Sequence, residues 1–160
     1  MDLSAYKMKW ADEMDMRNRM VSFVHGVCCL TLCGYYTYFA SVATCGSPNN
    51  QPEYFLAAMF QGYFTYDMLT MAWYGLLDRD MCLHHIGGVL GTSIAVFSGI
   101  NLYTLIWGAA IGELSNPCLH LRTMFKHLGW RYARCYEVAE LAFFFLFVFA
   151  RLVLGQYFYY

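Results

Sequence analysis

Five apolar segments constrain the fold of this chain more than any other feature of its sequence. They cover about residues 20–43, 54–77, 81–98, 101–121 and 136–158. A helix needs roughly 17–25 residues to cross a bilayer, so the segment at 81–98 is short and the others are ample. The chain is 59% hydrophobic and 13% charged over its 160 residues, whereas a soluble domain is about 25% charged. The sequence therefore indicates a membrane protein.

The apolar segments show no alternation of apolar and polar residues, which argues against β-strands. A helix satisfies its own backbone hydrogen bonds in lipid. We therefore predict an all-α polytopic membrane bundle of about five transmembrane helices, with a single domain over residues 20–160. Residues 1–19 are expected to form an interfacial amphipathic segment, because apolar residues recur there at helical spacing among charges of both signs. These apolar residues are Leu3, Tyr6, Trp10 and Met14.

The basic residues favour one orientation of this bundle. If the five segments alternate in direction, nine of the ten lysines and arginines fall on the side of the N-terminus, and the opposite loops contain none. Basic loops remain on the cytosolic side of a membrane, or on the matrix side in mitochondria, so the N-terminus is predicted there. The nine are Lys7, Lys9, Arg17, Arg19, Arg79, Arg122, Lys126, Arg131 and Arg134. The tenth, Arg151, lies inside the fifth segment.

Polar side chains from four segments are expected in the same half of the membrane. Their depth from the basic side follows from a rise of about 1.5 Å per helical residue. By this measure His84 and His85 lie about one turn in, His25 and Asn116 about 9 Å, Glu113 about 13 Å and Asp67 about 16 Å. Ionisable groups at such depths are costly and mark functional sites or buried pairs. The sequence therefore predicts one common polar site.

Helical spacing adds detail to two of the segments. Glu113 and Asn116 lie on one face of the fourth segment, and Pro117 removes the backbone hydrogen bond to the carbonyl of Glu113. A kink is therefore expected beside this carboxylate. In the third segment, Gly87 and Gly91 form a Gly-x-x-x-Gly pattern, which lets another helix approach closely.

The adjacent histidines are the candidate catalytic groups. His84 or His85 could act as a general base or nucleophile in acyl transfer, with Asp67 or Glu113 tuning the imidazole. Alternatively, these groups pair with one another as structural contacts between helices. Metal binding is disfavoured, because adjacent helical residues point about 100° apart, and no metal ligands are predicted. Arg151 could bind a lipid head group or a carboxylate, or its side chain could extend to the membrane surface.

With these residues identified, the sequence resembles the TLC-domain family, which includes ceramide synthases and smaller TLC-domain proteins. The resemblance covers most of the chain. It rests on five ordered pieces, which are Asn18-Arg19-Met-Val-Ser22-Phe-Val-His25, Gly62-Tyr-Phe-Thr-Tyr-Asp67, Leu83-His84-His85, Glu113-Leu-Ser115-Asn116-Pro117 through Leu121-Arg122, and Phe144 to Arg151.

The resemblance implies a helical membrane bundle that receives lipid or acyl chains. It also implies a catalytic centre at the histidine pair in those members that synthesise ceramide. Carried over to this chain, the catalytic residues of an enzyme would be His84, His85, Asp67 and Glu113. The implied lipid-binding residues are His25, Asp67, His84, His85, Glu113, Asn116, Arg122 and Arg151.

The chain also departs from the ceramide synthases. Their fourth-segment motif looks like His-Asp-x-Ser-Asp, whereas this chain has Gly112-Glu113-Leu-Ser115-Asn116, which is similar to the smaller TLC-domain proteins. Family members usually have a span before the first piece and another after the last, so the chain is expected to be shortened at both ends.

These departures favour a non-catalytic protein that binds or organises lipid as an accessory subunit of a larger membrane complex. No cofactor is expected beyond a bound phospholipid or acyl chain. Membrane lipids and other membrane protein subunits are the expected partners, and nucleic acid is not. The first alternative is an N-acyltransferase that uses acyl-CoA and a sphingoid base. The second is an ion or proton pathway through His25, Asp67, Glu113 and Arg151. The resemblance implies the endoplasmic reticulum, and the mitochondrial inner membrane is the alternative.

Overall fold

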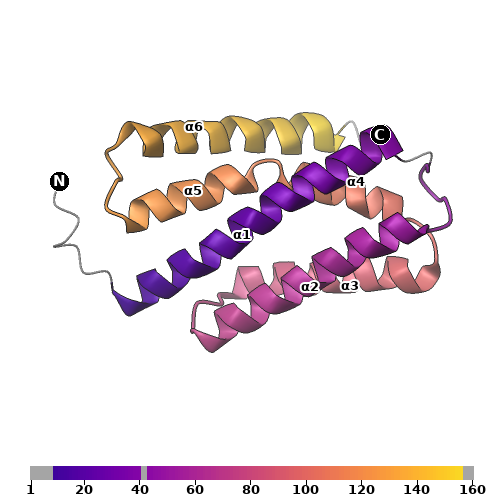
Figure 1. Ribbon diagram of the computed structural model, residues 1–160, viewed down its shortest axis with the longest axis horizontal. Coiled ribbons are helices and arrows are strands. Elements are labelled where there is room, and N and C mark those ends of the chain that lie inside the picture. Colours follow the sequence, from indigo (N-terminus) through magenta and orange to yellow (C-terminus); the bar gives the residue numbers. More distant parts are fainter. Residues whose placement is uncertain (1–8, 41–42, 157–160) are drawn as a thin grey trace.

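The computed structural model describes residues 9–40 and 43–156 and consists of helices joined by short connections (Figure 1). Two helices continue into π-helical turns, labelled η. The elements are α1 (Trp10–Tyr35), η2 (Tyr36–Ala40), α2 (Gln51–Trp73), α3 (Arg79–Ser98), α4 (Leu102–Glu113), α5 (Asn116–His127), α6 (Arg134–Val148) and η3 (Phe149–Leu154).

The helices make five passes along the bundle in alternating directions, as predicted (Figure 1). The passes are α1 with η2, α2, α3, α4 followed by α5, and α6 with η3. We call the end that holds the start of α1 and the connections 74–78 and 128–133 the basic end. The end that holds the connections 43–50 and 99–101 is called the far end.

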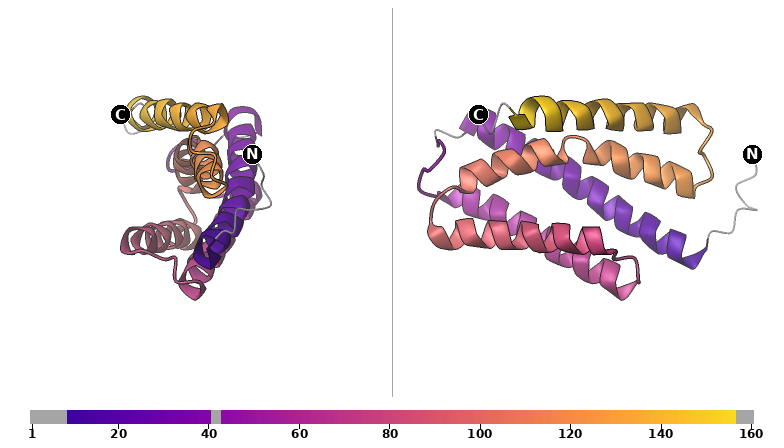
Figure 2. Two further views of the ribbon diagram at one scale, coloured as in Figure 1. Left: turned by 90° about the vertical axis from the view of Figure 1, so that its left-hand side faces the viewer. Right: turned by 180° about the vertical axis from the view of Figure 1, so that it is seen from behind.

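Helix α1 crosses the bundle obliquely and packs on α4 and α5, while α2 packs on α3 and α5 on α6. Seen end-on, α3 and α6 lie well apart with α4 between them, and α1 runs along the opposite side (Figure 2). The side of α4 that is turned away from α1 therefore lies between two separated helices. This arrangement positions the polar residues described below.

By length and composition, two of the described helices could each cross a membrane, namely residues Trp10–Phe39 and Arg79–Ser98. The fourth and fifth passes are each interrupted. The fourth is broken between α4 and α5, beside Pro117, as the sequence predicted. The fifth changes from α-helix to π-helix at Phe149.

Two boundaries differ from the predictions. Residues 10–19 were expected within a separate interfacial segment, but they form the first turns of α1 and continue directly into the first pass. Ion pairs one turn apart support this continuation, since Arg17 contacts Glu13 at 2.6 Å and Arg19 contacts Asp15 at 3.1 Å. Residues 1–8 of the predicted segment lie outside the described residues.

The second difference concerns the basic residues that follow the fourth segment. We expected a loop from Arg122 to Arg134, but α5 continues to His127. The physical reason is a contact with α1, because His127 Nε2 lies 2.7 Å from Asp15 Oδ2 and His127 Nδ1 lies 3.6 Å from Asp12 Oδ1. The last turn of α5 thus has a partner that the local sequence does not reveal.

At the far end, asparagine side chains fasten the loop after η2 to the turn between α3 and α4. Asn49 donates to the carbonyl of Ala95 at 2.7 Å and accepts from the backbone of Leu102 at 3.0 Å. Asn101 has a φ of 72°, a left-handed conformation that asparagine tolerates. Its side-chain oxygen accepts from the backbone of Gly46 at 2.8 Å. These bonds fix the far-end opening of the groove described below.

Candidate functional site

A buried polar network joins the first three helices. The side-chain amide of Asn18 on α1 donates to Asp67 Oδ1 on α2 at 2.6 Å. Nε2 of His85 on α3 lies 3.0 Å from the other oxygen, Asp67 Oδ2. His85 is 2% exposed and Asp67 is 3% exposed. Both carboxylate oxygens of Asp67 are therefore occupied, and the ring of His85 is held on the inner side of α3.

Two more histidines lie close to this network without joining it. His25 on α1 stacks on the ring of Tyr63, with centroids 3.6 Å apart and planes at 7°. His120 on α5 is buried. Among the described residues, neither His25 Nε2 nor His120 Nδ1 has a hydrogen-bond partner, and the same holds for His85 Nδ1. The interior of the bundle thus contains imidazole nitrogens that stay available for a proton or a small polar group.

Glu113 belongs to a different part of the bundle, the junction between α4 and α5. Asn116 donates to Glu113 Oε2 at 3.1 Å. The carboxylate faces Gly26 on α1, where an added Cβ would lie only 3.1 Å from Glu113 Oε2 and 3.6 Å from Pro117 Cγ. The absence of a side chain at Gly26 therefore makes room for the polar kink.

His84 lies on a different face of α3 from His85 and is exposed. Its ring contacts the edge of Phe64, with centroids 5.8 Å apart. Phe64 also contacts His85, with centroids 5.5 Å apart. The rings of His84 and His85 contact each other edge to face, with centroids 5.6 Å apart, so the exposed histidine adjoins the buried network. Gly87, Gly88 and Gly91 follow His84 along the same face of α3.

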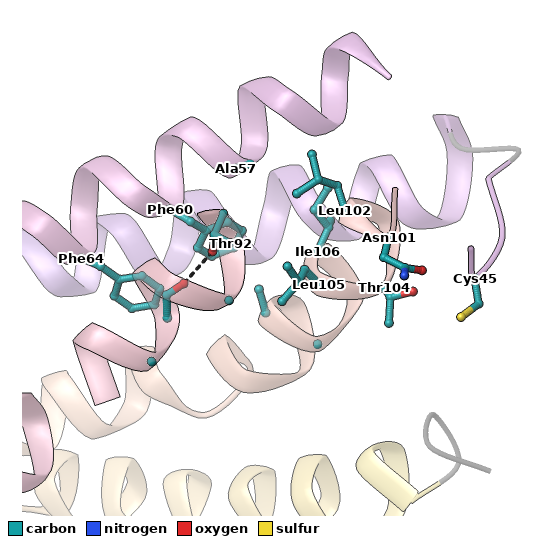
Figure 3. A pocket seen from close by; sticks show the side chains of 15 residues that line it. Cys45, Ala57, Phe60, Phe64, Thr92, Asn101, Leu102, Thr104, Leu105 and Ile106 are labelled. Carbon is teal, nitrogen blue, oxygen red and sulfur yellow. Dashed lines mark hydrogen bonds between the residues drawn. The ribbon is translucent and has the colours of Figure 1, made fainter. Parts of the chain in front are cut away.

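A groove runs along this glycine face between α3 and α4, with α2 as its floor (Figure 3). Its volume is about 500 Å³, within the range of ligand pockets in proteins. Figure 3 shows the side chains of Phe60 and Phe64 from α2 on one side and those of Leu105 and Ile106 from α4 on the other. Cys45 lies at the far-end opening. The lining is mostly apolar, as an acyl chain requires.

Arg151 lies beyond the end of this groove that is opposite Cys45, which we call the inner end. Its guanidinium carbon lies 5.7 Å from the ring centroid of Phe147, one turn earlier in the same pass. Its Nη1 lies 3.8 Å from the position of a Cβ on Gly112 of α4. The side chain therefore points back toward the basic end and does not extend to the far surface. The Arg151 charge is close enough to interact electrostatically with His84 and Glu113.

Arg122 lies apart from the groove, at the contact between α5 and α6. Its Nε lies 3.9 Å from Glu140 Oε1, and its guanidinium lies 5.8 Å from the ring centroid of Phe143. The residues predicted to share one site are thus distributed over several places. Asp67 and His85 form the buried network, Glu113 and Asn116 form the kink, and His84 and Arg151 lie at the inner end of the groove.

Two buried polar residues were not among the predicted site residues. One is Asn18, which completes the network at Asp67 and shares a buried stripe of α1 with Ser22 and Gly26. That helical spacing was the available signal. The other is Glu53, which is 1% exposed and accepts from the hydroxyl of Tyr36 at 2.7 Å. Its Asn50-x-x-Glu53 pattern is a capping box, which predicts a helix start but not burial.

The described residues contain no group of three or more histidine, cysteine, aspartate or glutamate side chains that could hold a metal ion. The buried network instead has the arrangement of an oriented base, in which a carboxylate fixes one imidazole nitrogen. A catalytic function would also require a substrate within reach of that imidazole. Phe64 lies between the groove and His85, so the open histidine is His84.

Comparison with known proteins agrees with the helical fold and its apolar helices. The family model of the TLC domain matches residues 15–160. This match covers all six helices except the first turns of α1. No solved structure matches the chain. Because the family model covers most of its length, the chain belongs to the TLC-domain family of membrane proteins.

Proposed function

We propose that this protein binds a lipid in the groove between α3 and α4 and does not catalyse a reaction on it. The groove is the observation that carries the proposal. It is apolar, has a volume of about 500 Å³ and opens beside Cys45 at the far end. In a family of lipid-related membrane proteins, such a groove fits an acyl chain, with His84 and Arg151 near the polar end of the ligand.

The non-catalytic part of the proposal rests on how the polar groups are separated. A histidine that acts as a general base is usually oriented by a carboxylate. Here Asp67 orients His85, which is 2% exposed. His84 is exposed one turn beyond the lining residues Gly87 and Gly88, but no carboxylate oxygen of the described residues lies within 4.0 Å of it. The imidazole that Asp67 orients is therefore buried, and the exposed imidazole has no carboxylate that orients it.

Lipid binding is tested by native mass spectrometry of the full chain purified in a mild detergent. The wild type is expected to retain a lipid-sized adduct. Gly108→Leu should lose it, because a Cβ at Gly108 meets nothing within 4 Å and the leucine would project into the groove that Gly108 lines. Gly62→Leu is the matched control, since Gly62 is exposed on α2 and also has nothing within 4 Å. Equal adducts in all three proteins would sink the proposal.

The alternative function is N-acyl transfer from acyl-CoA to a sphingoid base, and the exposure of His84 at the groove favours it. The amine nitrogen would attack the thioester carbonyl, the carbon–sulfur bond would break, and the released thiol would take the proton that His84 removes from the amine. Purified wild type and His84→Ala are compared for amide formation. Absence of product with the wild type rules this alternative out, whereas activity that His84→Ala abolishes would replace the non-catalytic proposal.

We further propose that the protein acts as an accessory subunit beside other membrane proteins, in the endoplasmic reticulum or the mitochondrial inner membrane. Large apolar side chains on the outer faces of several helices support this, for example Phe97 at 89% and Trp73 at 85% exposure. Solubilisation from its native membrane followed by size analysis tests the proposal. A stable monomer with neither partner nor lipid would contradict it.

A further inference from the structure

We propose that the inner end of the groove selects an anionic head group, and that Arg151 is the residue that recognises it. The ligand would be an amphiphile with an acyl chain and a carboxylate or phosphate head. This inference rests on the proposed lipid-binding function and specifies the charge of the lipid.

The position of Arg151 requires a counter-charge. Its side chain is exposed, it lies within the fifth pass, and it points toward the basic end over Phe147. No carboxylate among the described residues lies within ion-pair distance of it. An unpaired cation inside a membrane is costly and ordinarily has a partner.

The nearest candidate inside the chain does not fill this role. The carboxylate of Glu113 is one residue from Gly112 but is directed to the other side of α4, toward Gly26 and Asn116. It can attract Arg151 from a distance without forming an ion pair. The space in front of the guanidinium therefore keeps an excess of positive potential, which would favour an incoming anion.

Arg151 and His84 both lie beyond the inner end of the groove lining. On α3, His84 is one turn beyond Gly87 and Gly88, the last glycines of the lining. On α4, Gly112 is one turn beyond Gly108, and the guanidinium of Arg151 lies beside Gly112. A cation and an imidazole thus flank the inner end. An arginine binds a carboxylate or phosphate through two parallel hydrogen bonds, and a histidine can add a third.

The charged group lies at one end of the apolar part of the α4 wall. From Asn101 to Gly112 this wall extends for roughly 16 Å. The uncharged polar residues Asn101 and Thr104 lie at the far-end opening, the apolar lining continues from Leu105 to Ala109, and Arg151 lies against Gly112 on the side of the basic end. A lipid in the leaflet at the basic end has its head and chain in this same order. The ligand could therefore enter from that leaflet without reversing its direction.

The experiment compares three probes with the same sixteen-carbon chain. They are palmitate, hexadecyl phosphate and the neutral hexadecanol, each titrated into the purified full chain in detergent by calorimetry. We expect both anions to bind at least about tenfold more tightly than the alcohol, since hydrogen bonds between ionised groups are stronger than those to a neutral hydroxyl. The stronger of the two anions indicates whether a fatty acid or a lipid phosphate is the better ligand.

Variants of the protein distinguish binding of the head group from binding of the acyl chain. Arg151→Gln should weaken both anions to the level of hexadecanol and leave hexadecanol unchanged, while Arg151→Lys should have an intermediate effect. Arg134→Gln is the matched control, because Arg134 is exposed at the start of α6, away from the groove. Gly108→Leu should weaken all three probes.

The possible results are distinguishable. If the wild type binds hexadecanol as tightly as both anions, the head-group inference is overturned and the proposed lipid binding stands, even should Arg151→Gln fail to fold. If none of the probes binds the wild type, the proposed function fails together with the inference. If Arg151→Gln and Arg134→Gln weaken the binding of both anions equally, the effect is a general effect of charge. This result would also overturn the role of Arg151.

Discussion

Asp67 is the residue on which the buried network depends. Its two carboxylate oxygens contact Asn18 and His85 from two other helices, so one substitution leaves two buried polar groups without a partner. Asp67→Ala is expected to lower the free energy of unfolding by about 3 kcal/mol or more. Thermal unfolding of the purified protein measures this loss.

The matched control for Asp67→Ala is Asp80→Ala, an exposed carboxylate in the first turn of α3. This substitution should change the stability by less than about 0.5 kcal/mol. Equal effects of the two substitutions would mean that the network does not hold the first three helices together.

The two adjacent histidines show what residue-level sequence analysis could not decide. Their spacing predicts that they point about 100° apart, but both sides of α3 are apolar, so the pattern does not reveal which histidine faces inward. The structure buries His85 and exposes His84. The rotation of α3 is set by the contact of His85 with Asp67 on α2, a different helix of the bundle, and no local signal in α3 encodes it.

At the scale of elements, α2 and α3 pack at Gly88. A Cβ at this position would lie 2.7 Å from Phe64 Cε2 and 2.9 Å from Phe64 Cδ2, and the phenyl ring is already wedged against both histidines. Gly88→Ala is therefore expected to destabilise the protein by roughly 1–3 kcal/mol. Chemical unfolding in detergent gives the value.

Gly87 provides an internal comparison for this prediction. A Cβ there meets nothing within 4 Å, so Gly87→Ala should leave the stability unchanged or raise it by up to about 1 kcal/mol, because alanine favours a helix more than glycine does. Similar destabilisation by both substitutions would show that the effect is not the contact with Phe64.

The ends of α1 and α5 at the basic end are held by His127, whose two ring nitrogens face Asp12 and Asp15. His127→Ala should accelerate hydrogen exchange of the backbone amides in the first turns of α1, because the polar contact that ties these turns to α5 is lost. Hydrogen–deuterium exchange with mass spectrometry reads this directly. Lys126→Ala, an exposed neighbour, should leave exchange unchanged, and an equal acceleration would contradict the role of His127.

At this scale the sequence largely predicted where helices form, but it did not predict which helices pack against each other. Apolar length predicted the five passes, and Pro117 predicted the break beside Glu113. The extent of α5 was missed because its last turn depends on aspartates of α1. Local sequence determines where a helix can form, whereas contacts between distant segments determine where it ends.

At the scale of the whole molecule, the orientation in the membrane remains a prediction from the basic residues. Two exposed cysteines lie at opposite ends of the bundle, Cys45 at the far end and Cys135 at the basic end. In sealed vesicles with the cytosolic side outward, a membrane-impermeant maleimide should label Cys135 and reach Cys45 only after permeabilisation. Peptide mass mapping identifies the labelled residue, with Cys45→Ser and Cys135→Ser as controls. The reverse pattern would invert the topology.

The groove is also a property of the whole molecule, because α2, α3 and α4 all contribute to its lining. The Gly87-x-x-x-Gly91 pattern predicted close packing of another helix, but a Cβ at either glycine meets nothing within 4 Å. The glycines instead widen the space between α3 and α4. Sequence spacing alone does not distinguish a glycine that admits a helix from one that leaves room for a ligand.

Photo-crosslinking with a diazirine-bearing fatty acid shows whether an acyl chain occupies the groove between α3 and α4. The probe is added to membranes that contain the full chain, irradiated, and its attachment sites are mapped by peptide mass spectrometry. We expect labelling within residues 87–92 and 101–109, the segments of α3 and α4 that contribute to the lining, and loss of that labelling in Gly108→Leu but not in Gly62→Leu. Labelling confined to the outer faces of the helices, unchanged by Gly108→Leu, would contradict the proposed lipid binding.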